Sequence, residues 1–201
     1  MPEPAPQRTS WHRLVTRVRV PLSFAVVALF LWLDWRRGVR PHRVTWFGAA
    51  PDPVGLAGFI VVIAGVAVRA WAAGTIHKAK KVSREGPYAL VRHPLYLGSL
   101  LIALGFCLVI GDPVNFVVVL VLALAIYGPK VRAEEREMGE KFGAEYDSYR
   151  REVPAVIPWK VPVAVSHAWQ WEIYSRHREY RAGLTALCAL ALLEIYTLYI
   201  M

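Results

Sequence analysis

Residues 95–129 read LYLGSLLIALGFCLVIGDPVNFVVVLVLALAIYGP, two apolar runs with only Gly111 and Asp112 before Pro113. Each run is longer than a typical strand and slightly shorter than the roughly 20 residues that a helix needs to cross a membrane. So short a break predicts a tight helical hairpin, with helices over Leu95–Ile110 and Pro113–Pro129. The alternative is a pair of buried helices in a soluble protein.

Three further apolar segments flank this hairpin, at Val20–Trp35, Val54–Gly74 and Ala182–Met201. The last two have the length of a membrane span, and the first reaches it if the arginines before it extend to the membrane surface. Five such segments in a chain of 201 residues, 56% of them hydrophobic, would be hard to cover with protein. The sequence therefore predicts an all-α integral membrane protein, a single membrane domain over 1–201 with about five transmembrane or membrane-embedded helices.

The basic residues are distributed unevenly between the polar segments. The chain carries a net charge of +9; the N-terminal tail, loop 75–93 and segment 130–181 together hold nineteen Lys and Arg residues, against four in loop 36–53. Because cytoplasmic loops are enriched in Lys and Arg, we expect the N-terminus, loop 75–93 and segment 130–181 to be cytoplasmic. The same asymmetry accounts for the positive charge without a nucleic-acid partner.

The chain becomes polar after Pro129. Glu and Lys recur there at helical spacing, which favours a helix that continues the fourth apolar segment into the cytoplasm, with Glu137 and Glu140 on a solvated face. Residues 153–159 contain two prolines and cannot form a long helix. We expect the apolar residues of that stretch to lie against the membrane surface.

The densest chemical signal is the stretch GPYALVRHPLYLG at 86–98. Pro94 suits the first turn of a helix, which places Arg92 and His93 just before a helix N-terminus. Backbone N–H groups there lack helical partners and favour anions, and an arginine can hold a carboxylate with two hydrogen bonds. The alternative is that both residues simply meet lipid phosphates at the interface.

Further candidates are ionisable residues in or near the apolar segments. Glu134 and Glu135 follow the fourth segment by about one turn and could hold the amine of a ligand, or else form a solvated face. Arg69 and Glu194 lie inside apolar segments, where ionisable groups are functional candidates by default, although they could extend to the membrane surface. The two cysteines lie in apolar segments and no histidines are four residues apart, so no metal site is expected. The glycine-rich signature of a Rossmann turn is also absent from the sequence.

Several of these pieces, in this order, resemble the isoprenylcysteine carboxyl methyltransferase and phospholipid methyltransferase superfamily over about residues 69–159. They are Gly86-Pro87-Tyr88, Arg92-His93-Pro94 with Tyr96 and Gly98, the hairpin, Glu134-Glu135, Phe142-Gly143 with Tyr146 and Tyr149, and Val153-Pro154 to Ile157-Pro158. The resemblance implies a membrane methyltransferase that uses S-adenosyl-L-methionine without a Rossmann domain. Residues 160–201 add a linker and a further C-terminal helix that the family pattern does not match.

The resemblance also implies roles for individual residues. Arg92 and Glu134 would be catalytic, and Lys130 and Arg92 would face the substrate; the isoprenylcysteine enzymes have arginine where this chain has Lys130. That departure leaves the acceptor open, as a carboxylate, amine or thiol on a lipophilic or small molecule. The implied cofactor contacts are Lys80, Lys81, Val82, Ser83, Tyr88, His93, Pro94, Leu95, Tyr96 and Glu134.

Two other functions compete with methyl transfer. The sterol and isoprenoid double-bond reductases are membrane enzymes with partly similar helices, and they use NADPH. A catalytically silent membrane scaffold could also keep the same fold. Ligand binding separates the three, because only the first would take S-adenosyl-L-methionine.

Overall fold

The structure is a computed structural model that describes residues 32–44, 52–75, 82–159, 169–177 and 179–200. The chain divides into two compact units, Met1–Arg40 and Pro41–Met201. In the first unit only residues 32–40 are described, and residues 32–36 are helical. Most of the apolar segment expected at Val20–Trp35 therefore lies outside the described residues. All that follows concerns the second unit.

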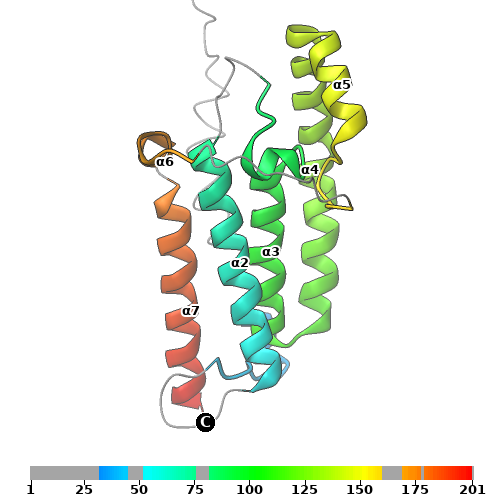
Figure 1. Ribbon diagram of the computed structural model, residues 1–201. Helices are drawn as coiled ribbons and strands as arrows, with labels where there is room; N and C mark the ends of the chain where they lie inside the picture. Colours follow the sequence, from blue (N-terminus) through cyan, green and yellow to red (C-terminus); the bar gives the residue numbers. More distant parts are fainter. Residues whose placement is uncertain (1–31, 45–51, 76–81, 160–168, 178, 201) are drawn as a thin grey trace, which may run out of the picture. The chain divides into compact units, whose positions relative to one another are not determined.

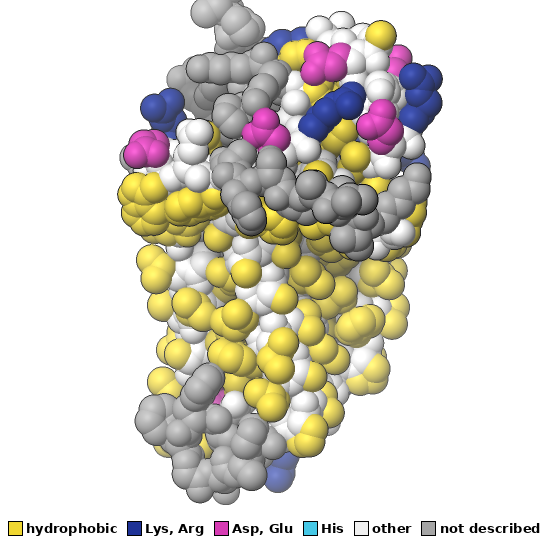
Figure 2. All heavy atoms as spheres, in the orientation of Figure 1, with side chains coloured by type: hydrophobic (Ala, Val, Ile, Leu, Met, Phe, Trp, Pro, Cys, Tyr) yellow, Lys and Arg dark blue, Asp and Glu magenta, His cyan; other side chains and the backbone are white. Residues whose placement is uncertain are grey.

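The described part of the second unit consists of helices and the loops that join them, with no strand (Figure 1). The helices α2, α4 and α7 are long and apolar enough to cross a membrane, and α3 is a shorter apolar helix. Figure 2 shows hydrophobic side chains covering the length of these helices, with Lys, Arg, Asp and Glu side chains gathered near α5 and α6. The prediction of an all-α membrane protein is thus confirmed. The elements are α2 (Pro53–Thr75), the 3₁₀ helix η1 (Gly86–Ala89), α3 (Pro94–Ile110), α4 (Pro113–Phe142), α5 (Ala144–Glu152), α6 (Trp171–His177) and α7 (Tyr180–Ile200).

The predicted hairpin is formed by α3 and α4. Gly111 ends α3 in the left-handed conformation, with φ of 79°, and its N–H bonds the carbonyl of Cys107. Asp112 caps α4, since its side chain accepts the N–H of Val114 at 2.9 Å. The helix then runs through Pro129 to Phe142 without a break. The expected continuation of the fourth segment beyond the apolar run is therefore confirmed.

Glycines set the close packing of α2 against α3. A Cβ atom at Gly98 would lie 2.8 Å from the carbonyl oxygen of Gly65, and one at Gly105 would lie 2.8 Å from that of Gly58. Within each helix the two glycines are seven residues apart, two turns along one face. Small residues let helix backbones approach closely in a membrane. This contact fixes the start of α3, which carries the candidate site.

We expect Gly98→Ala to lower the free energy of unfolding by about 1–3 kcal/mol, because the new methyl group has no space between α2 and α3. Gly139→Ala in α4 is the matched control, since nothing lies within 4 Å of the position of its Cβ. That control should be neutral or slightly stabilising, because alanine favours a helix over glycine. Thermal unfolding in detergent measures both, and equal stability of the two variants would contradict the tight packing.

The C-terminal helix α7 packs back along α2. The indole nitrogen of Trp169 donates to the carbonyl of Ala70 at 3.1 Å, and the Trp169 ring lies against Gly74. The Arg69 guanidinium donates to Ser99 Oγ, and to the carboxylate of Glu179 at 2.5 Å. Arg69 therefore joins α2, α3 and the residue before α7, whereas Glu194 lies elsewhere on α7.

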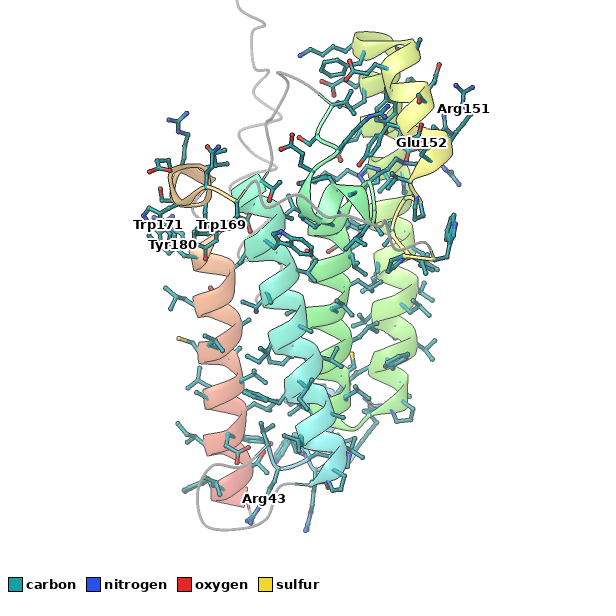
Figure 3. All side chains as sticks on the ribbon, in the orientation of Figure 1. Arg43, Arg151, Glu152, Trp169, Trp171 and Tyr180 are labelled. Carbon is teal, nitrogen blue, oxygen red and sulfur yellow. The ribbon has the colours of Figure 1, made fainter. Side chains whose placement is uncertain are left out.

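An aromatic cluster surrounds the start of α6. The rings of Trp169, Trp171 and Tyr174 have centroids 5.6, 5.8 and 6.1 Å apart, and Figure 3 shows Trp169 and Trp171 beside Tyr180 at the beginning of α7. Trp171 is 62% exposed. Trp and Tyr concentrate where a membrane meets water, so this cluster marks one interface.

Candidate functional site

Glu135 is the centre of a polar cluster formed by the start of α3, the polar half of α4 and the chain after α5. Its Oε1 accepts Arg92 Nε at 2.9 Å and Arg92 Nη2 at 2.6 Å. Its Oε2 lies 3.6 Å from Nε of Arg150. The side chains of Arg92 and Glu135 are each only 10% exposed. The pair is therefore an almost buried ion pair that joins two elements.

The remaining contacts of Arg92 hold the segment that follows α5. Its Nη1 donates to the carbonyls of Arg150 at 2.7 Å and Val153 at 2.8 Å. Its backbone N–H donates to the carbonyl of Pro154, and that of His93 donates to Ala155, at 2.8 and 2.9 Å. The backbone N–H groups of Arg92 and His93 are thus used within the chain, just before the helix start at which the sequence suggested an anionic ligand.

His93 lies between the two glutamates. Its Nε2 is 3.3 Å from Oε1 of Glu135, and its Nδ1 is 3.7 Å from Oε2 of Glu134. Burial lowers the pKa of His93, and the hydrogen bond to Glu135 opposes that shift only in part. The imidazole is therefore neutral near pH 7, and its contact with Glu135 is a hydrogen bond rather than an ion pair.

Glu134 faces a more open environment than Glu135. The hydroxyl of Tyr96 donates to Glu134 Oε1 at 2.5 Å. The Tyr96 ring stacks on Tyr127 with centroids 5.0 Å apart, and Lys130 Nζ lies 5.4 Å from the centroid of the Tyr96 ring. The Glu134 side chain is 44% exposed. Of the two glutamates, Glu134 is therefore the one that a ligand can reach.

Tyr88 supplies a buried hydroxyl close to this cluster. The residue is 6% exposed, and no hydrogen-bond partner for its hydroxyl is found among the described residues. Its backbone carbonyl accepts the hydroxyl of Tyr149 at 2.7 Å. Burial raises the pKa of Tyr88, and the charges of Tyr149, Glu179 and Glu134 raise it further. The hydroxyl therefore keeps its proton and can donate to a ligand.

The other implied cofactor residues lie around this centre. Pro94 is buried at the start of α3, Leu95 and Ser83 are half-buried, and Val82 is buried with Tyr146 and Tyr149 under α5. Lys80 and Lys81 lie outside the described residues. The structure thus brings Arg92, His93, Tyr96, Lys130 and Glu134 together, while Val82 lies on the α5 side.

Sequence reasoning missed the contributions of Tyr127 and Arg150 and understated that of Glu135. Tyr127 lies three residues before Lys130 and seven before Glu134, so helical periodicity alone places all three on one face of α4. Nothing local marks Arg150, because its contact depends on the chain turning back after α5.

Comparisons with known proteins identify relatives of this chain. The family model described as phospholipid methyltransferase matches residues 54–145. The cobalt-zinc-cadmium resistance protein CzcN of Cupriavidus metallidurans is 31% identical over 158 residues, 77% of this chain and 70% of the relative. The nickel-cobalt-cadmium resistance protein NccN of Alcaligenes xylosoxydans xylosoxydans is 31% identical over 147 residues, 72% of this chain and 66% of the relative.

The chain is also similar to proteins named as methyltransferases. A protein-S-isoprenylcysteine O-methyltransferase of Schizosaccharomyces pombe is 38% identical over 77 residues, 37% of this chain. The match spans 31% of the yeast protein's own length.

Proposed function

Because the chain belongs to the isoprenylcysteine and phospholipid methyltransferase superfamily, we propose that it transfers a methyl group to an acceptor that is lipophilic or small. We propose S-adenosyl-L-methionine as the methyl donor. One observation carries the proposal: the Arg92-His93 turn and the Glu134-Glu135 pair meet in a single cluster at the start of α3. We take 69–159 as the methyltransferase core, and 160–201 as a linker and an additional helix.

The donors and acceptors of the cluster fit such a cofactor. Glu134 offers an accessible carboxylate for an ammonium group or a ribose hydroxyl, and Tyr88 offers a buried hydroxyl without a partner among the described residues. When bound, the cofactor supplies an electrophilic methyl group on a sulfonium. Carboxylates near the site favour a cofactor with an ammonium group over one with several phosphates, because like charges repel.

Arg92 acts in this proposal as a positioning residue. Its contacts with Glu135 and with the carbonyls of Arg150 and Val153 engage its guanidinium inside the chain. It therefore holds α3, α4 and the segment after α5 in register, so that His93, Tyr96 and Glu134 keep their places. Precise placement of reacting groups is a major source of rate acceleration.

The acceptor would approach near Lys130, which is exposed on α4 and lies over the ring of Tyr96. A carboxylate acceptor needs no base, because it is ionised near pH 7. An amine must first lose a proton, which Glu134 can accept. A thiol would likewise have to be deprotonated.

Calorimetry on the purified full-length protein tests the cofactor. We expect binding of S-adenosyl-L-methionine or its demethylated product, and none of NADPH. Tyr88→Phe should weaken that binding by roughly tenfold, because one hydrogen bond to a charged group is lost. Thermal stability should not fall, since the hydroxyl has no hydrogen-bond partner among the described residues. Binding of NADPH would favour the reductase, and binding of neither cofactor would favour a scaffold.

We also propose an orientation of the protein in the membrane, in which α5 and the Arg92 turn face the cytoplasm. Figure 3 shows Arg151 on α5 and Arg43 at the opposite end of the helices. In a chain whose Cys107 and Cys188 are replaced, we expect an impermeant thiol reagent on intact cells to label Arg43→Cys. Labelling of Arg151→Cys should require permeabilised cells. The reverse pattern would invert the proposed topology.

A further inference from the structure

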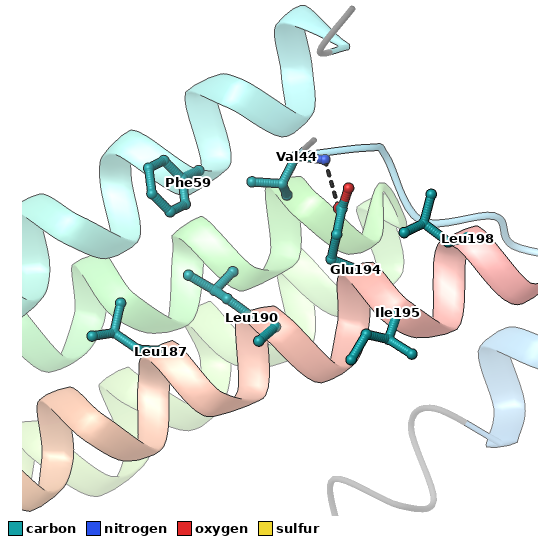
Figure 4. Close-up of a pocket in the computed structure, with 8 residues that line it drawn as sticks. Val44, Phe59, Leu187, Leu190, Glu194, Ile195 and Leu198 are labelled. Atoms are coloured by element: carbon teal, nitrogen blue, oxygen red, sulfur yellow. Dashed lines mark hydrogen bonds between the residues drawn. The ribbon is translucent and has the colours of Figure 1, made fainter. Parts of the chain in front are cut away.

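A small apolar pocket lies between α2 and α7, remote from the Arg92 cluster (Figure 4). Its volume is about 230 Å³. Side chains of both helices and of the chain before α2 line it, among them Phe59, Leu187, Leu190, Leu198 and Val44. The single ionisable group among its described lining residues is Glu194.

Glu194 is only 7% exposed, and its carboxylate is half satisfied. Oε2 accepts the backbone N–H of Val44 at 2.9 Å, while Oε1 is buried and has no hydrogen-bond partner among the described residues. The neighbouring Thr197 does not help, because its hydroxyl donates to the carbonyl of Leu193 at 2.8 Å. Burying a polar atom without a hydrogen-bond partner costs free energy, so a ligand that donates a hydrogen bond to Oε1 would be favoured.

The pocket opens toward lipid at the far end of the membrane span. Glu194 lies about 21 Å along α7 from Tyr180, at a rise of about 1.5 Å per residue, and the helix ends at Ile200. Leu187 is 43% exposed, Ile195 62% and Leu198 38%. A ligand can therefore enter from the bilayer, in the leaflet opposite the proposed methyl-transfer site.

We propose that this pocket binds a membrane amphiphile whose head is a primary ammonium attached directly to an aliphatic chain. The ammonium donates a hydrogen bond to Glu194 Oε1 and complements its charge, which no Lys or Arg among the described lining residues does. The aliphatic chain lies along Phe59, Leu187 and Leu190. A quaternary ammonium has no N–H to donate, and an alcohol has no charge, so both should bind more weakly. This site is independent of the proposed methyl transfer.

Photolabelling of the full-length protein in lipid nanodiscs tests the proposal. The probe is dodecylamine with a photoreactive diazirine in its chain, and the comparators are the matching dodecanol and dodecyltrimethylammonium. We expect the amine to label peptides of α2 and α7 at least tenfold more than either comparator, as a hydrogen bond to a charged group would give. Labelling of equal extent by all three would overturn the proposal.

Two variants test whether the labelling depends on the Glu194 carboxylate and on the pocket around it. Glu194→Gln can still accept the Val44 N–H but presents an amide NH₂ in place of the open oxygen, so amine labelling should fall at least tenfold while thermal stability stays near wild type. Leu187→Trp fills the pocket from its exposed rim and should reduce labelling without any change at Glu194. Glu172→Gln, on the exposed side of α6, is the control. Undiminished labelling in both pocket variants would show that the amine binds elsewhere.

Discussion

Replacing Arg92 with lysine is expected to reduce methyl transfer by two orders of magnitude and the free energy of unfolding by about 2–4 kcal/mol. The guanidinium donates at once to Glu135 and to the carbonyls of Arg150 and Val153. A single ammonium cannot reach all three. Turnover of labelled cofactor and thermal unfolding measure the two effects. The loss of stability is expected because the Arg92 side chain is only 10% exposed, so this is not a surface substitution.

The control for this substitution has to be chosen from the structure. Arg84 has its own contacts, since it donates to the carbonyl of Glu145 at 2.7 Å and lies 5.5 Å from the centroid of the Tyr149 ring. Arg151 is exposed on α5 and makes a cleaner comparison in Arg151→Lys. If Arg92→Lys matches that control in both turnover and stability, Arg92 is an interfacial anchor and the positioning role is wrong.

Substitutions of the neighbouring residues Glu134 and Glu135 are expected to have different effects, one on cofactor binding and the other on stability. Glu134→Gln should weaken binding of S-adenosyl-L-methionine by roughly ten- to a hundredfold and leave stability near wild type, because the carboxylate is partly exposed and makes few internal contacts. Glu135→Gln should lower the free energy of unfolding by about 2–4 kcal/mol, because it weakens a nearly buried pair with Arg92. Calorimetry and thermal unfolding separate the two results.

Glu137→Gln is the control for both glutamates, since Glu137 is exposed on the same helix. Equal and small losses of affinity at Glu134 and Glu137 would mean that this part of α4 is a solvated face. A double-mutant cycle between Arg92 and Glu135 adds a readout specific to the pair. We expect their effects on cofactor affinity to be strongly non-additive, as for residues that act through one contact.

Apolar runs and turn residues allowed most of the helices to be predicted. Gly111 and Asp112 form the expected turn, and α2, α3 and α7 begin and end within two residues of the predicted segments. Side-chain partners could not be predicted in the same way, because they depend on how each helix is rotated against its neighbours. Arg69 illustrates the limit: its partner Glu179 lies in what the sequence presents as a polar linker.

The site could be predicted only in part for the same reason. The sequence places Arg92 near a helix start, but the carbonyls that its guanidinium contacts lie in the last turn of α5 and just after it. The choice between Glu134 and Glu135 depends on about 100° of rotation around α4, which no local pattern specifies. The glycine contacts of Gly65 with Gly98 likewise need the relative register of two helices.

The carbonyls of Pro154 and Ala155 that meet the backbone of Arg92 and His93 have a consequence for biosynthesis. The ribosome makes α2 and α3 before it reaches residue 155, so these two helices can form while Arg92 still lacks its carbonyl partners Val153 and Pro154. The cluster is completed only when this later segment folds back onto the start of α3. A chain that ends before residue 153 therefore lacks part of the cluster, and the complete arrangement is acquired late in translation.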